Sequence, residues 1–190
     1  MGHSDIQIHT TKKDWESVLS EVDSYDFYHT YDYHQISKKE GENPALLVYS
    51  KDEVLIALPL LIREIPDSGF RDATSVYGYA GPVSRSCGAT FDNTAYRQAL
   101  QAFLEKEKII SIFTRMNPYI PGQETLLDGL GSLRPLGDLV NIDLTRDIAA
   151  SRAAYRRDTK SRVNKARRNF VVKKRSEEHT SELQSLLIIS

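Results

Sequence analysis

The sequence predicts an α/β or α+β domain in which helices flank a central mixed sheet. Short runs rich in Val, Ile and Leu, which suit buried strands, alternate along the chain with longer segments whose apolar residues recur at helical spacing. The chain has 190 residues, of which 40% are hydrophobic and 27% are charged. This size and composition are typical of one globular domain, or of one domain and part of another, and exclude a collagen-like or disulfide-scaffold protein.

Two helices are expected first. Thr11 followed by Asp14 resembles a capping box, and the apolar residues that come next repeat at helical spacing. These residues are Trp15, Val18, Leu19 and Val22. A second helix is expected over residues 31–40, because Gly41 and Asn43-Pro44 then stop it.

A hairpin of two buried strands is expected next, over residues 45–49 and 54–62, with polar residues between them. Pro59 cannot donate a hydrogen bond to a neighbouring strand, so we expect a bulge or a free edge there. Residues 65–73 combine a proline, a glycine and several charges, which indicates a surface loop.

The rest of the chain continues the mixture of strands and helices. Residues 75–85 are expected to form a short strand that runs into a tight turn, and Asp92 or Asn93 can cap a helix that ends near Lys108. Two prolines make residues 117–121 a rigid loop. The remaining expected elements are a strand over 109–114, a strand over 139–144, and one or two helices over 147–170.

Positive charge is concentrated near the C-terminal end. The formal net charge is only −1, but residues 1–155 carry −7 and residues 156–190 carry +6. Within this region, residues 156–174 hold nine basic residues against Asp158 alone. Such a segment suits a phosphate-rich substrate, a transfer RNA or an anionic membrane surface. An ordinary basic connector between domains is the alternative.

The last residues differ in character from the rest. Residues 175–185 reverse-translate, residue for residue, into a common short-read sequencing adapter. We therefore expect the biological sequence to be cut near Lys174 and residues 175–190 to be an adapter-derived artefact. A natural polar tail is the alternative, and the uninterrupted genomic reading frame distinguishes the two.

No conventional catalytic motif is present. The five histidines lack the spacing of a metal site, and the chain has neither a G-x-S-x-G elbow nor a phosphate-binding P-loop. We therefore expect no bound metal and assign no general base. The single Cys87 favours a reducing, cytoplasmic location. The longest apolar run, nine residues ending at Ile62, is too short to span a membrane, so any contact with the inner membrane face is expected to be peripheral.

Two loops carry candidate binding residues. Tyr77 and Tyr79 lie in a turn rich in Gly and Pro, where they offer flat apolar faces and hydroxyl donors to a ligand. Packing of both rings into a core is the alternative. Arg115 ends an expected strand before a proline-rich loop, where its guanidinium can hold a carboxylate or phosphate through two hydrogen bonds. An ordinary ion pair is the alternative for Arg115.

Together these segments resemble the FemAB family of bacterial aminoacyl and acyl transferases. The similarity spans most of residues 10–174, and its cues are residues 30–39 leading into the hairpin, the YGYAGPV turn, Arg115 with Asn117-Pro118, and residues 141–145 followed by the basic run 158–168. The resemblance implies two packed domains of the GNAT acyltransferase type. Residues 1–155 would be the first, GNAT-like N-terminal domain, and residues 156–174 a basic helix leading to a missing C-terminal domain.

The resemblance also implies an activity, the transfer of an aminoacyl or acyl group to an amine of a phosphate-bearing cell-wall (peptidoglycan) precursor. The co-substrate would be aminoacyl-tRNA or acyl-CoA, with no bound cofactor, and this half alone would be inactive. The residues implied to contact the acceptor are Lys39, Arg115, Tyr119, Lys160 and Arg162. The family has Asp-Pro where this chain has Asn117-Pro118.

Two other functions remain open. The first is a GNAT-type N-acyltransferase that uses acyl-CoA on an amino sugar or an exopolysaccharide precursor. The second is a non-catalytic module whose basic helix binds RNA or a membrane surface.

Overall fold

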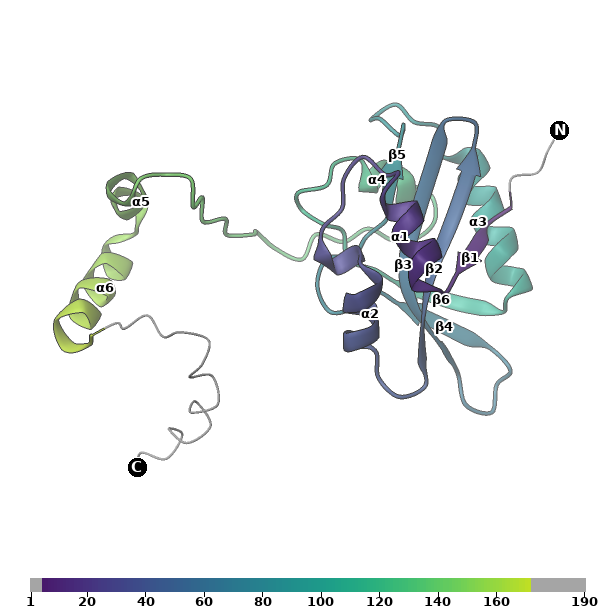
Figure 1. Ribbon diagram of the computed structural model, residues 1–190, viewed down its shortest axis with the longest axis horizontal. Helices are drawn as coiled ribbons and strands as arrows, with labels where there is room; N and C mark the ends of the chain where they lie inside the picture. The colour runs from purple at the N-terminus through teal and green to yellow at the C-terminus, as the bar shows by residue number, and fades with distance from the viewer. Residues whose placement is uncertain (1–4, 172–190) are drawn as a thin grey trace. The chain divides into compact units, whose positions relative to one another are not determined.

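A computed structural model describes residues 5–171, which fall into two compact units, one ending at Gly137 and the other beginning at Asp138. The first unit is a six-stranded sheet with helices packed on it (Figure 1). Its strands are β1 (Gln7–His9), β2 (Glu42–Lys51), β3 (Val54–Glu64), β4 (Arg71–Thr74), β5 (Val83–Arg85) and β6 (Ile109–Phe113). Its helices are α1 (Lys12–Leu19), the 3-10 helix η1 (Phe27–His29), α2 (Tyr31–Ser37), α3 (Thr94–Lys106) and α4 (Gln123–Leu127). The predicted mixed α/β class is therefore confirmed.

The order of the strands places two loop segments at one edge of the sheet. Neighbouring strands follow the order β1-β2-β3-β4-β6, and β5 pairs with β3 beside this path. All pairs are antiparallel except β4 and β6, which run parallel with Thr74 opposite Phe113. Because the carboxyl ends of parallel strands meet at the same edge, the loops that follow β4 and β6 begin side by side.

The β2–β3 hairpin is the backbone of the sheet and is longer than expected, with paired residues from Glu42 opposite Arg63 to Lys51 opposite Val54. Pro59 lies opposite Leu46 on the β2 side. On its other side, β3 pairs with β5 through residues 55–57 and with β4 through residues 61–64. Pro59 lies in the gap between these two partners, so the expected free edge at the proline is confirmed.

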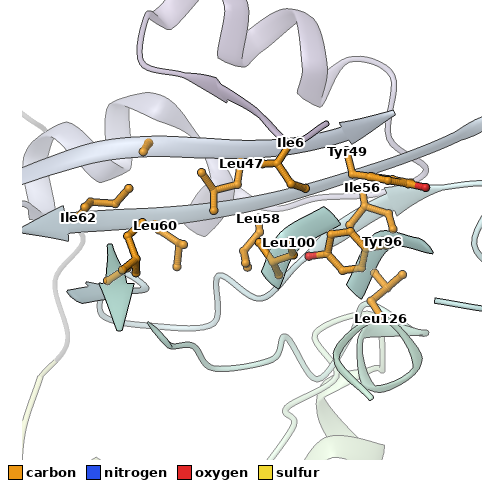
Figure 2. Packing of buried hydrophobic residues seen from close by; sticks show 13 residues of the cluster. Ile6, Leu47, Tyr49, Ile56, Leu58, Leu60, Ile62, Tyr96, Leu100 and Leu126 are labelled. Atoms are coloured by element: carbon orange, nitrogen blue, oxygen red, sulfur yellow. The ribbon is translucent and has the colours of Figure 1, made fainter. Parts of the chain in front are cut away.

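Alternate residues of β2 and β3 point to opposite faces of the sheet, and each face is covered by helices. On one face the strands pack against Tyr96 and Leu100 of α3 and Leu126 of α4 (Figure 2). On the other face they pack against Trp15 and Leu19 of α1. The unit therefore has three layers, helix, sheet and helix, and its core lies on both sides of the hairpin.

Side chains expected to cap α1 and α3 form hydrogen bonds at the starts of both helices. The Thr11 side chain accepts a hydrogen bond from the backbone N–H of Asp14, which confirms the predicted start of α1. At α3, Asp92 Oδ1 accepts from the backbone N–H of Thr94 at 2.9 Å, while the side chain of Asn93 caps nothing. Asn93 instead donates to the backbone oxygens at the end of α4, including that of Asp128 at 2.8 Å.

Three sequence expectations about strands are corrected by the structure. Residues 71–73, which were expected to end a loop, belong to strand β4, where Asp72 pairs with Arg63 across the ladder at 2.6 Å and Arg71 pairs with Glu107 at 2.6 Å. Residues 75–82 are loop, and only Val83–Arg85 is strand. Residues 139–144 are not a strand, and no partner pairs with them among residues 5–171. Strand propensity alone does not order a segment without a partner ladder.

The second unit contains the two helices expected near the C-terminus, α5 (Ile148–Ala154) and α6 (Arg157–Asn169). Its first residue, Asp138, precedes the expected domain boundary at 155/156. None of the residues in these two helices is buried. The expected end near Lys174 and the expected artefact over 175–190 lie outside the described residues. Of the helices in residues 5–171, none combines the length and the apolar character needed to cross a bilayer.

Candidate functional site

The candidate site consists of the loop after β4, residues 75–82, and the loop after β6, residues 114–122. Their backbones are joined where they leave the sheet, because the N–H of Ser75 donates to the oxygen of Phe113 at 2.8 Å. Further out, Thr114 Oγ1 donates to the oxygen of Ala80 at 3.3 Å. The parallel pairing of β4 and β6 therefore continues into two loops that are in contact with each other.

Asn117 is the junction between these loops. The residue is only 4% exposed, and its Nδ2 donates to the backbone oxygen of Tyr79 at 3.3 Å. The same Nδ2 donates to Oδ2 of Asp26 at 2.6 Å, and Oδ1 accepts from the backbone N–H of Tyr119 at 2.9 Å. Since every polar atom of this amide has a partner, Asn117 holds three separate segments in one arrangement.

Gln123 at the start of α4 forms hydrogen bonds to both loops. It is buried, its Nε2 donates to the backbone oxygen of Pro82 at 2.7 Å, and its Oε1 accepts from the backbone N–H of Asn117. A Cβ placed on Gly81 would lie 2.9 Å from the amide of Gln123. A side chain at this position would therefore displace the amide of Gln123 from its hydrogen bonds to Pro82 and Asn117.

The segment around η1 is the third segment that meets at Asn117. Asp26 caps η1 by accepting from the backbone N–H of Tyr28 at 2.9 Å, and its Oδ1 lies 3.1 Å from Nδ1 of His29. His29 is fully buried, and its backbone oxygen accepts from Nε1 of Trp15 at 2.8 Å. Burial lowers the pKa of His29, although Asp26 acts in the opposite direction. His29 therefore links η1 to α1 through its backbone oxygen, and its buried, neutral imidazole is not presented to a ligand as a base.

An aromatic patch, defined here as Phe27, Tyr28, Tyr33, Tyr77 and Tyr79, covers the place where η1 and α2 meet the first loop. The ring centroids of Tyr28 lie 4.0 Å from Phe27, 5.4 Å from Tyr33 and 5.8 Å from Tyr79. The hydroxyl of Tyr33 donates to the backbone oxygen of Tyr77 at 2.9 Å. Burial of the ring raises the pKa of Tyr28, so this hydroxyl stays neutral.

Gly78 allows the first loop to approach these rings. Its φ is +124°, a backbone conformation that L side chains rarely adopt. A Cβ on Gly78 would also lie 2.1 Å from the ring of Tyr28. Only a glycine accommodates both the dihedral angle and the aromatic contact.

Four of the predicted binding residues lie in these two joined loops: Tyr77, Tyr79, Arg115 and Tyr119. Tyr77 and Tyr119 are 85% and 63% exposed, and Tyr79 is 36% exposed, so the alternative of packing into a core does not hold for Tyr77. Tyr77 and Tyr119 therefore present most of their surface to solvent, where a ligand can reach them.

Arg115 is half-buried, and its guanidinium carbon lies 5.7 Å from the ring centroid of Phe113. Its Nε is buried and has no hydrogen-bond partner among residues 5–171. The alternative of an ordinary ion pair for Arg115 is not observed in the described part of the chain. A cation held by an aromatic ring and without a carboxylate partner is suited to bind an anionic group of a ligand.

The other three predicted residues lie elsewhere. Lys39 is in the turn between α2 and β2, where its backbone N–H donates to Oε2 of Glu42 at 2.9 Å. Lys160 and Arg162 are exposed on α6 of the second unit. Lys160 donates to the backbone oxygen of Ala153 at 3.0 Å, and Arg162 pairs with Asp158 at 3.0 Å.

A shallow hollow of about 510 Å³ lies at the start of α3. It is lined on its polar side by Asp92, Arg97, Glu124 and Asp128, and it includes none of the predicted binding residues. Arg97 also packs on Gly129. Among residues 5–171, no group of three or more His, Cys, Asp or Glu side chains is arranged to hold a metal ion.

Sequence reasoning did not identify Asp26, His29, Gln123 and the rings of Phe27 and Tyr28 as parts of this site. The spacing of Asp26 and His29, three residues apart as in a capping box, is the one local signal for η1. Nothing in the sequence near Gln123 indicates that it reaches Pro82.

The chain was also compared with known proteins. No protein-family model matches it, and neither a curated protein nor a solved structure matches it.

Proposed function

We propose that the chain is the N-terminal half of a FemAB-like transferase, which moves an aminoacyl or acyl group to an amine of a peptidoglycan precursor. The proposal is supported chiefly by the meeting of the two loops. The YGYAGPV turn and the segment after Arg115 are two of the segments that carry the resemblance, and Asn117 joins them by its hydrogen bond to Tyr79. They lie at the carboxyl ends of neighbouring strands, where ligands of α/β proteins commonly bind.

The loops would bind the acceptor and hold it in place. Arg115 would pair with a phosphate or carboxylate of the precursor, and the exposed rings of Tyr77 and Tyr119 would pack on its sugar or base. In the reaction, the acceptor amine attacks the acyl carbonyl, a C–N bond forms, and the ester bond to tRNA or the thioester bond to CoA breaks. Such a reaction depends strongly on the orientation of its reactants, and orientation is the part that these loops would supply.

A proton acceptor for the amine is not found in the two loops. Nδ1 of His29 lies 3.1 Å from Oδ1 of Asp26, which is hydrogen-bonded to the junction, but His29 is fully buried. A general base must come within hydrogen-bond distance of the proton that it removes, and His29 does not reach the surface. We therefore expect no acyl transfer by this chain alone from aminoacyl-tRNA or acyl-CoA. Measurable transfer would contradict the assignment of a half-enzyme.

Calorimetric titration of the full chain with a uridine-diphosphate-linked muropeptide tests the proposal. We expect saturable binding, and Arg115→Ala should weaken it about ten-fold or more because the charge-assisted pair is lost. Arg134→Ala is the matched control, since it removes an exposed arginine of the same unit outside both loops and should leave the affinity unchanged. Absence of binding, or equal affinity in Arg115→Ala, would overturn the proposal. Saturable binding of acyl-CoA without the muropeptide would favour the alternative acyl-CoA-dependent N-acyltransferase.

A further inference from the structure

The helix α6 carries a dense and exposed set of positive charges in the second unit. Its six basic residues, all exposed, are Arg157, Lys160, Arg162, Lys165, Arg167 and Arg168. The one acidic residue of the helix is Asp158, which pairs with Arg162 at 3.0 Å. Among residues 5–171, no salt bridge involves the other basic residues of α6. The helix therefore has a net positive charge that the described residues of its unit, 138–171, do not neutralise.

The basic side chains surround most of the helix. At about 100° per residue, they cover an arc of roughly 220° of its circumference. The remaining sector of roughly 140° is a stripe made of Thr159, Val163 and Ala166, and Phe170 follows directly after the end of the helix. Thirteen helical residues extend over about 20 Å, so the charges form a cationic rod long enough to meet several successive phosphates.

We propose that α6 binds the phosphate backbone of a nucleic acid. A row of Lys and Arg that neutralises phosphates displaces condensed counterions, and this displacement supplies most of the sequence-independent affinity for nucleic acids. Asp158 is the one acidic residue of α6 and pairs with Arg162, so the other five basic side chains of the helix are available for such contacts. This inference rests on α6 alone and does not depend on the transferase proposal.

An anionic membrane surface is the other polyanion that a basic helix can meet, and α6 is less suited to it. Interfacial helices bury a broad apolar face in the lipid. The stripe of α6 contains a threonine and an alanine, and Val163 is its one partly buried member. A helix with so little apolar surface would rely on charge alone, whereas nucleic acid needs no apolar face.

Fluorescence anisotropy with labelled hairpins tests the proposal on the full chain. The probes are an RNA hairpin and a DNA hairpin of the same sequence, each titrated over a series of KCl concentrations. The test variant is the triple substitution Arg157→Gln, Lys165→Gln and Arg168→Gln, whose side chains make no described ion pair. The control carries Lys13→Gln, Lys51→Gln and Lys106→Gln, which remove the same charge from exposed positions of the first unit.

We expect the chain to bind a hairpin with a steep salt dependence. The α6 triple variant should reduce the slope of log K against log[KCl] by about 2 to 3 and weaken binding at least about ten-fold at moderate salt. The control triple should change neither quantity. A preference between the RNA and DNA hairpins identifies the source of the phosphates. Far-UV circular dichroism of the variant checks that its helices remain folded.

Three results would overturn the proposal. They are no binding of either hairpin at low salt, equal binding by the α6 variant and the control, and tighter binding to vesicles of phosphatidylcholine and phosphatidylserine than to both hairpins. The last result would assign α6 to a membrane surface instead.

Discussion

Replacing Asn117 by Asp tests whether the loop junction requires an amide. The substitution removes the donor that lies 2.6 Å from Oδ2 of Asp26 and places a second carboxylate against it. A hydrogen bond to a charged group contributes about 1.5–3 kcal/mol. Asn117 is 4% exposed, but the side chain of Asp26 is 36% exposed, so solvent screens part of the repulsion. We expect the free energy of unfolding at pH 7 to fall by about 3 kcal/mol.

The loss in Asn117→Asp should depend on pH. Repulsion between two carboxylates favours a protonated form in the folded state, and one carboxyl group takes up a proton as the pH falls toward about 4. The destabilisation is therefore small at low pH and grows as the pH rises. Asn117→Ala removes the donor without adding a charge, so its smaller loss should not show this growth.

Urea denaturation followed by tryptophan fluorescence measures both effects. Trp15 is the single tryptophan, it is fully buried, and it donates to His29 beside Asp26. The exchange Asp26→Asn with Asn117→Asp restores one amide and one carboxylate, and it should be at least about 1.5 kcal/mol more stable than Asn117→Asp alone. The reasoning is refuted if Asn117→Asp is as stable as the parent chain at pH 7, or if the exchange restores nothing.

Two further predictions concern the stability of the same unit. Gly78→Ala should lower the free energy of unfolding by about 1–3 kcal/mol or more, because a φ of +124° and a Cβ 2.1 Å from the ring of Tyr28 both oppose a side chain. Thermal unfolding measures the loss, and Gly88→Ala is the control because a Cβ at Gly88 meets nothing within 4 Å. Equal melting temperatures of the two variants would contradict the prediction. Burial lowers the pKa of His34 to about 4 from 6.5. Because the folded pKa is the lower one, the unfolded chain takes up the proton first, so stability is present above pH 6.5 and is lost as the pH falls toward 4. From pH 7 to pH 5 this loss of stability amounts to about 2 kcal/mol. Urea denaturation at both pH values should show that His34→Phe lacks this contribution. An equal loss in the parent chain and in His34→Phe would show that His34 is not responsible.

The sequence predicted well the elements that are specified by residues within the same short segment. The cap of Thr11 and the apolar spacing after it specify α1 within a few residues. Polar residues between two apolar runs specify the β2–β3 hairpin, and Pro59 marks the gap in its ladder. Strand β4 was missed because its charged residues are paired in the folded chain, Asp72 with Arg63 of β3 and Arg71 with Glu107, which lies 36 residues away.

The candidate site was predicted in part. The sequence drew attention to Tyr77, Tyr79, Arg115 and Tyr119 because aromatic rings and an arginine stand beside glycines and prolines, and the structure brings their two loops together. The sequence did not show that Lys39 lies outside these two loops. The sequence also did not explain why an asparagine precedes Pro118. In the structure, the amide of Asn117 donates a hydrogen bond to the carboxylate of Asp26, which an aspartate could not do.

What the sequence determined by itself is therefore the mixed α/β class, the main helices and the central hairpin, while the binding residues that it indicated remain a prediction. What only the tertiary structure decided is how these parts meet. The hydrogen bonds of Asn117 join residues 91 and 38 positions apart in the chain. Residues 139–144 have the composition of a strand but form none, since a strand exists only where another strand satisfies its backbone groups. Local preferences act over a few residues, whereas pairing of β4 with β6 and burial of Asn117 depend on segments that the folded chain alone brings into contact.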